Sequence, residues 1–262
     1  KHNGKFKLGD MDIEKTDKYK YLGEILNDNC SLKNQIDEIK GKAEAALQTI
    51  LTIAGDKNFR GIQMKTIWKL VDTCIIPVLT YSSETWKINK GEMKSINQLL
   101  DNILKRILMT PVTTPRESLY IETGMMDLEH IIESKQLLSL NRLEKTKNSL
   151  MESVLNTTAK NSWVERVNRT MEKYTDEQIQ FAPKCRAKAV VKEKVRTAHM
   201  DKMMHAGTNT NKPKIKVKFL VDNLNNLPQS KPPKYITELN RIDASTIFNA
   251  RNRMLGVKRN FK

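Results

Sequence analysis

Lysine and arginine residues in the second half of the chain recur at two regular spacings, and cations at these spacings suit phosphate binding. A four-residue spacing places side chains in one stripe along a helix, and a two-residue spacing places them on one face of a strand. Like charges four residues apart repel by roughly a few tenths of a kcal/mol per pair, a cost that a polyanion lying along the stripe removes. The first series is Lys184, Lys188, Lys192 and Arg196, with Arg186 beside it, and the second is Lys214, Lys216 and Lys218. We expect these side chains to pair with phosphates, together with Arg251 and Arg253 near the C-terminus.

The excess positive charge is concentrated in the same half. The 262 residues carry 46 Lys+Arg and 30 Asp+Glu, a formal net charge of +16. Residues 1–130 contain 19 basic and 18 acidic residues, a net charge of +1, whereas residues 131–262 contain 27 and 12, a net charge of +15. This asymmetry predicts a polyanionic partner, with nucleic acid first and an anionic membrane surface second. A merely soluble, lysine-rich surface is the plain alternative.

A second candidate site is a short aromatic and basic segment near the N-terminus. Tyr19, Lys20 and Tyr21 precede Leu22-Gly23 in a stretch that alternates as β-strands do. The two tyrosines share one face of such a strand, and a small hairpin cannot bury both of its faces alone. An edge with alternating aromatic and basic side chains can support a nucleic-acid backbone. The plain alternative is that these rings belong to a hydrophobic core.

The residue types needed for self-contained catalysis are sparse. No D-x-D or D-D pair follows an apolar strand, so we expect no two-metal carboxylate site. His199 and His205 could share a site with Cys185, but that spacing fits no zinc pattern, and structural or solvated histidines are the favoured interpretation. The three cysteines lie far apart, which fits a reducing compartment, and no apolar run approaches the ~20 residues of a membrane span. We therefore expect no catalytic residue, metal ligand, cofactor or membrane partner in this chain.

The elements that position these residues are expected to be mainly helical. Residues 6–26 alternate between apolar and polar types and predict a small antiparallel unit of about three strands, with Gly9-Asp10 as a type II′ turn. From Ser31, an expected N-cap, apolar residues recur at three- and four-residue steps. The expected helices span about 31–55, 60–77, 91–109, 115–124, 127–145, 162–174 and 243–255, and a further helix carries the lysine stripe.

Local signals fix some of the expected helix boundaries. Pro77 should kink or end the second helix, because proline cannot donate to the carbonyl one turn earlier. Thr114 is the expected N-cap of a later helix, with Pro115 at its first position and Glu117 reaching back. Gly124 should end that helix.

These elements divide the chain into five expected regions. Residues 1–30 form a β-hairpin region and 31–145 a helical bundle, after which 146–205 form a basic helical connector. Gly, Pro, Asn and Lys make 206–240 linker-like, and 241–262 form a C-terminal helix with its basic end.

Several short strings follow one another in a distinctive order. The segment over 6–26 ends in the Tyr-Lys-Tyr-Leu-Gly string, and an amphipathic helix with Ile39 and Ala43 follows it. The next strings are Ile76–Trp86 (IPVLTYSSETW), Leu104–Leu108, Thr113–Pro115, Leu119–Gly124 and, near the C-terminus, Ile247–Leu255 (IFNARNRML). This ordered set resembles the C-terminal portion of reverse transcriptases from non-long-terminal-repeat, LINE-like retrotransposons.

The resemblance implies the end of the palm, the thumb and a basic connector, with Tyr19, Lys20, Tyr21, Leu22 and Gly23 as a primer grip. It places the catalytic carboxylates and their Mg²⁺ in a palm before this chain, and a zinc knuckle after it. The implied partners are a template–primer hybrid of RNA and DNA and the missing fingers–palm portion. The implied location is inside the cell, in the nucleus, with a cytoplasmic RNA–protein stage. Ser82 stands where the family usually has Gly, a change that is tolerable if its φ is negative.

The expected function is therefore binding of template–primer nucleic acid for an RNA-directed DNA polymerase, without catalysis by this chain alone. One alternative is a helical protein-interaction scaffold derived from a retroelement, without polymerase activity. A further alternative is a complete enzyme whose active site is not evident in the sequence.

Overall fold

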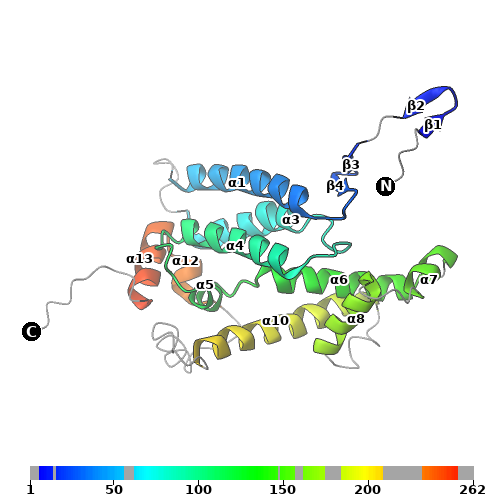
Figure 1. Ribbon diagram of the computed structural model, residues 1–262. Coiled ribbons are helices and arrows are strands. Elements are labelled where there is room, and N and C mark those ends of the chain that lie inside the picture. The colour runs from blue at the N-terminus through cyan, green and yellow to red at the C-terminus, as the bar shows by residue number, and fades with distance from the viewer. Residues whose placement is uncertain are drawn as a thin grey trace, which may run out of the picture.

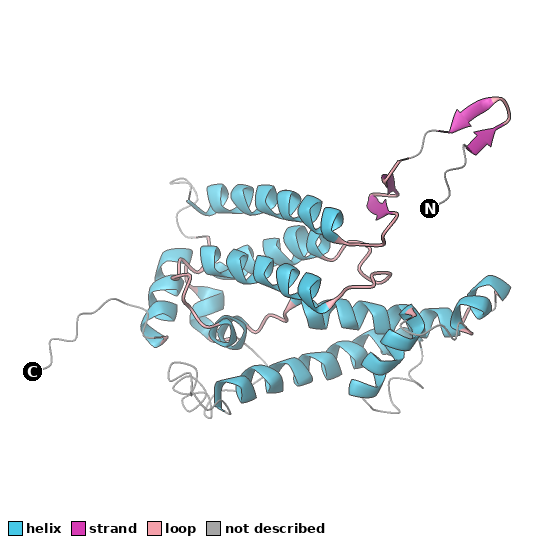
Figure 2. Cartoon of the chain, in the orientation of Figure 1, coloured by secondary structure: helices cyan, strands magenta, loops and turns pink. Residues whose placement is uncertain are grey.

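The computed structural model is a mainly helical body from which two short β-hairpins project (Figures 1 and 2). It describes residues 6–13, 16–55, 62–146, 148–156, 162–174, 184–208 and 232–252. The mainly helical class with N-terminal hairpins is confirmed. The strands are β1 (Phe6–Leu8), β2 (Met11–Ile13), β3 (Lys18–Tyr21) and β4 (Glu24–Asn27). The helices are α1 (Lys33–Gly55), α2 (Met64–Leu70), α3 (Ile76–Leu79), α4 (Lys90–Ile107), α5 (Arg116–Thr123), α6 (Leu128–Glu144), α7 (Ser149–Leu155), α8 (Trp163–Lys173), α10 (Lys184–Thr208), α12 (Lys234–Glu238) and α13 (Arg241–Arg251).

The main core forms where the predicted apolar stripes of the helices meet. Helix α1 buries the expected residues from Ile36 to Ile50, and α4 buries those from Ile96 to Ile107. Met203 of α10 and Phe248 of α13 join the same cluster, so the C-terminal segments pack on the helices of the first half. None of the described helices combines the length and apolar character needed to cross a bilayer.

A second, smaller core joins α6, α8 and α10. It contains Leu137 and Leu140 of α6, Val167 of α8, and Val191 and Val195 of α10. Helix α6 therefore contacts other helices on several sides, which is why its apolar residues do not form one clean stripe.

The N-terminal strands form two separate hairpins rather than one three-stranded unit. Gly9 has φ +61 in the first turn, as expected for a Gly-Asp turn between paired strands. In the second turn both Leu22 and Gly23 have positive φ, +46 and +87, which is the backbone of a type I′ turn. Each two-residue turn joins two strands that pair only with each other, so β1–β2 and β3–β4 form separate two-stranded sheets.

Pro77 does not end its helix at once. Helix α2 continues through a π-helical turn (Val71–Ile75) into α3, where the proline occupies the first turn. The wider turn accommodates the missing N–H and the ring clash one turn earlier. Helix α2 begins at Met64, and 56–61 lie outside the described residues.

The expected cap at Thr114 is wrong, whereas the end at Gly124 is confirmed. The N-cap of α5 is Pro115, without a side-chain hydrogen bond, and the Thr114 hydroxyl instead contacts the preceding turn, where it donates to Pro111 O at 2.7 Å and lies 2.6 Å from Thr110 Oγ1. Gly124 has φ +65 and closes the helix. Ser162 caps α8 by accepting the Glu165 N–H.

Candidate nucleic-acid interface

The loop after α3, residues 80–88, is held in place by side chains from α6 and α8. Lys135 Nζ donates to Thr80 O at 2.6 Å, and Gln136 Nε2 donates to the carbonyls of Ser83 and Trp86 at 3.2 and 3.0 Å. From α8, Trp163 Nε1 donates to Glu84 O at 2.8 Å, and the Arg166 guanidinium donates to Ile88 O. These contacts satisfy backbone carbonyls that no regular element pairs, so the loop is a fixed platform. It contains the end of the IPVLTYSSETW string.

This platform holds the turn of the β3–β4 hairpin. Tyr81 Oη donates to Leu22 O at 2.6 Å, and Ser82 Oγ donates to Glu24 Oε2 at 2.7 Å. A Cβ on Gly23 would lie 3.2 Å from Tyr81 Oη, in a backbone conformation that L side chains rarely adopt. Glycine at position 23 thus serves both the turn and the close approach of the tyrosine. Two motifs about sixty residues apart in sequence are in direct contact here.

The hairpin presents its aromatic side chains to solvent. Tyr19 is 62% exposed and Tyr21 57% exposed, and neither belongs to the core. Lys20, between them, bonds Glu38 of α1, with Nζ 2.8 Å from Oε1. Hydrogen bonds from Lys20 and Lys42 lower the pKa of Glu38 to about 2. The tyrosine rings are therefore open to a ligand, whereas the lysine between them already has an ionic partner.

The resemblance to reverse transcriptases tolerates Ser82 in place of glycine only if its φ is negative. The structure contradicts this condition, because the φ of Ser82 is +57. A non-glycine residue in this left-handed region costs roughly 1–2 kcal/mol. The hydrogen bond from Ser82 to Glu24 offsets part of that cost. The backbone at Ser82 therefore keeps the left-handed conformation that suits glycine, and the serine occupies it with some strain.

Two of the predicted cations on α10, Lys192 and Arg196, line a groove of about 460 Å³, which we call the basic groove. Lys192 and Arg196 meet Lys65 and Lys69 of α2 across it. Its wall also includes Asp72. Burial raises the pKa of Asp72, and the positive charge of Lys192 offsets part of this rise. The lining thus carries four cations and one carboxylate, a balance that attracts phosphate.

The geometry of α10 explains why these cations point into the groove. Ala187, Val191, Val195 and Met203 are buried, so their face of the helix packs on the body. Lys192 and Arg196 each follow a buried valine by one position, and this places them at the edge of the contact. Sequence analysis missed Lys65 and Lys69, although their four-residue spacing on one helix was a usable signal.

The other predicted phosphate-binding residues fall in different settings. Lys188 is exposed on α10, while the side chains of Lys184 and Arg186 lie outside the described structure. Arg251 pairs with the buried carboxylate of Glu122, with Nε 2.8 Å from Oε1, and its guanidinium lies over the ring of Tyr235. Lys214, Lys216, Lys218 and Arg253 lie outside the described residues. The β3–β4 hairpin carries Tyr19 and Tyr21, and we call it the tyrosine hairpin. None of its residues lines the basic groove.

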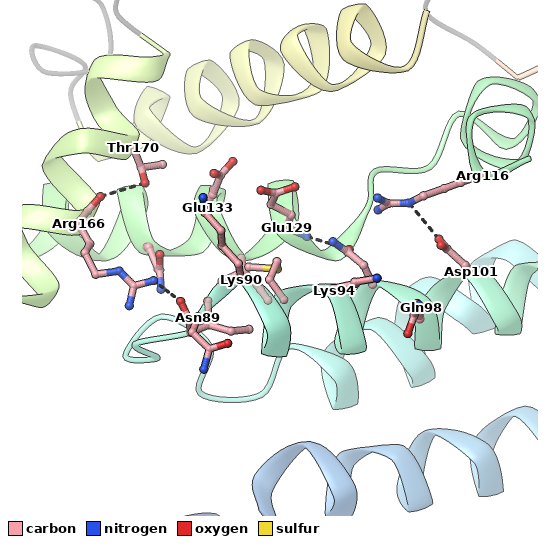
Figure 3. Close-up of a pocket in the computed structure, with 15 residues that line it drawn as sticks. Asn89, Lys90, Lys94, Gln98, Asp101, Arg116, Glu129, Glu133, Arg166 and Thr170 are labelled. Atoms are coloured by element: carbon pink, nitrogen blue, oxygen red, sulfur yellow. Dashed lines mark hydrogen bonds and ion pairs between the residues drawn. The ribbon is translucent and has the colours of Figure 1, made fainter. Parts of the chain in front are cut away.

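A second cavity, of about 530 Å³, opens between α4, α6 and α8 (Figure 3). Its lining contains both cations and carboxylates, so the charge of this cavity does not favour a polyanionic ligand. Arg116 closes one end by pairing with Asp101, with Nε 3.3 Å from Oδ1 (Figure 3). The charged residues of this polar cleft are Lys90, Lys94, Asp101, Arg116, Glu129, Glu133 and Arg166.

Behind the polar cleft lies a buried group with the side-chain types of a metal site, which sequence analysis did not find. Asp127, His130 and His199 bring one ligand atom each to within 4.8 Å of one another. Burial lowers the pKa of His199 to about 4. Burial alone would raise the pKa of Asp127, but bonds from His130 hold it well below its usual value.

Comparison with known proteins gives a distant relationship. An uncharacterized transposon-derived protein of Caenorhabditis elegans is 23% identical over 172 residues. This chain is distantly homologous to a transposon-derived protein. The match covers 63% of this chain and 60% of the relative's length. Comparisons with protein-family profiles and with solved structures find no match.

Proposed function

We propose that this chain binds template–primer nucleic acid as the thumb and connector of a non-long-terminal-repeat retrotransposon reverse transcriptase, without catalysis of its own. The observation that carries the proposal is the basic groove. Cations from two helices far apart in sequence, Lys65 and Lys69 on α2 and Lys192 and Arg196 on α10, line one cavity. The distant homology to a transposon-derived protein supports a mobile-element origin.

The groove suits a phosphate backbone better than a single small anion. Lys65, Lys69 and Lys192 are exposed, so that successive phosphates can approach them without displacing buried groups. Contacts of this type supply affinity without sequence preference, as a polymerase needs.

The tyrosine hairpin supports the same proposal from another side. Its turn is fixed by Tyr81 and Ser82, while the rings of Tyr19 and Tyr21 stay exposed. A rigid hairpin with open aromatic rings can brace the end of a primer strand, and exposed rings can stack on bases.

The experiment is a salt titration of binding to a fluorescently labelled RNA–DNA hybrid. The logarithm of the association constant should fall linearly with the logarithm of the salt concentration. The slope of this line should be about −0.9 for each phosphate neutralised. Four groove contacts predict a slope near −3.6 by the same relation. A slope near zero would refute the proposal. Primer extension with Mg²⁺ by this chain alone would overturn its non-catalytic part.

One observation favours the second candidate, a protein-interaction scaffold. The β1–β2 hairpin exposes Phe6, Leu8, Met11 and Ile13, each by more than half. Such side chains commonly pack against another polypeptide. Docking through apolar side chains should hardly respond to salt, so the same titration separates the two functions when the hybrid and a candidate protein partner are compared.

A further inference from the structure

Three buried side chains that commonly ligate metals converge between α6 and α10. Asp127, His130 and His199 are each at most 1% exposed. Asp127 Oδ1 lies 2.5 Å from His130 Nδ1, and Asp127 Oδ2 lies 3.9 Å from His199 Nε2. One ligand atom from each residue lies within 4.8 Å of the others, and side-chain rotation would have to bring these three atoms to the roughly 2 Å bond lengths of a single ion.

Helix geometry explains the convergence. Asp127 is the N-cap of α6 and accepts the His130 N–H at 3.0 Å, so the two side chains share one face of the first turn. Helix α10 packs along α6 and supplies the third residue. The two imidazole rings lie with their centroids 4.8 Å apart.

His199 is not satisfied as a structural histidine would be. Its Nε2 accepts the Asp127 N–H at 3.3 Å, and its buried Nδ1 has no hydrogen-bond partner within the described structure. A buried polar atom without a partner is destabilising, and native structures keep few of them. The hydrogen bonds of the described structure therefore leave one nitrogen of this buried ring unused.

The surrounding charges also leave room for a cation. Arg116 is shared between two carboxylates, with Nη2 2.8 Å from Asp127 Oδ2 and Nε 3.3 Å from Asp101 Oδ1. With neutral imidazoles the network carries one net negative charge, which is costly when buried. The guanidinium bonds Oδ2 of Asp127, while Oδ1 accepts the backbone N–H of His130 and contacts the His130 ring, so an ion at this carboxylate would replace the contact with the ring. Outer hydrogen bonds of this kind are common around metal-bound carboxylates. Arg116 also lines the polar cleft, so this side chain connects the cleft to the buried group.

The geometry points to one divalent transition-metal site, formed by Asp127, His130 and His199, that takes Zn²⁺. Two imidazole nitrogens and one carboxylate oxygen suit Zn²⁺ or Co²⁺, whereas Mg²⁺ and Ca²⁺ prefer oxygen ligands throughout. Among the described His, Cys, Asp and Glu residues no fourth joins the group, so a water completes the tetrahedron. The ion would fasten α10, with Lys192 and Arg196, to the start of α6.

The test uses the full chain stripped of metal by a chelator. Addition of Co²⁺ should give the visible absorption of a tetrahedral site and saturate at one equivalent, and Zn²⁺ should displace it. Zn²⁺ should also raise the thermal unfolding temperature, because it binds only the folded chain. Folded wild-type protein that gives no spectrum and no stabilisation would overturn the proposal without any variant.

Two ligand variants and one control test the assignment. Asp127→Asn keeps a good helix cap but removes the carboxylate, and His199→Gln removes the α10 ligand. Each should weaken Zn²⁺ binding by more than the roughly 10–100-fold typical of losing a partner outside the ligand shell. His205→Gln is the matched control, since His205 is exposed on the same helix, and it should bind as wild type does. Equal loss in the control, or no loss in folded Asp127→Asn, would refute the assignment.

Discussion

Removing two lysines from the basic groove gives a decisive test of nucleic-acid binding. We expect the double variant Lys65→Gln/Lys69→Gln to lose two phosphate contacts, because both exposed lysines line the groove opposite α10. Each contact contributes about 0.9 to the salt slope, so the slope should become less steep by about 1.8.

The same relation sets the loss of affinity. Relative to 1 M salt, one contact strengthens binding about 5.5-fold at 0.15 M, and two contacts about 30-fold. The double variant should therefore bind an RNA–DNA hybrid about 30-fold more weakly at 0.15 M salt and equally well near 1 M. Fluorescence anisotropy across the salt range measures both quantities.

The matched control is Lys33→Gln/Lys40→Gln. These two exposed lysines lie on α1 outside the groove, and their loss changes the net charge by the same two units. The control should bind within about twofold of wild type. If both double variants weaken binding equally, the charge acts diffusely and the groove is not the binding site.

Three further predictions concern the platform that holds the hairpin. Gly23→Ala should destabilise the docked hairpin by about 1–2 kcal/mol, because the new Cβ meets Tyr81 at positive φ, and amide exchange over β3–β4 should accelerate at least about fivefold. Unchanged exchange would contradict that role for the glycine. Ser82→Gly should be about 1 kcal/mol more stable in urea than Ser82→Ala, since both lose the bond to Glu24 but only alanine keeps the backbone strain. Equal stabilities would show that position 82 is unstrained. Trp163→Phe should lower the free energy of unfolding by about 1 kcal/mol through loss of the bond to Glu84 O, and a change below a few tenths would show that this bond does not brace the loop.

The helical elements of this chain were largely predictable from local sequence. The apolar stripes of α1 and α4 follow from residue periodicity, because one face of each helix contacts one core. The helix end at Gly124 follows from backbone chemistry within a few residues. The prediction of Thr114 as the cap was wrong because helix α5 begins one residue later and the hydroxyl bonds the preceding turn at Thr110 and Pro111, contacts that the motif did not reveal.

The candidate sites were predictable only in part. The stripe on α10 indicated phosphate binding, but the partners Lys65 and Lys69 come from a helix more than a hundred residues earlier. His199 was interpreted as structural, since nothing near it in sequence completes a metal site. Its partners Asp127 and His130 lie about seventy residues away.

The sequence by itself determined the helical class, the turn at Gly9-Asp10 and the asymmetry of charge, because these depend on residues close together along the chain. Only the tertiary structure decided which of these residues meet. Tyr81 reaches the Leu22 carbonyl, α2 faces α10 across the basic groove, and His199 joins Asp127. Such contacts depend on how helices dock through their buried faces, and one apolar stripe accepts many partners until the whole core has packed.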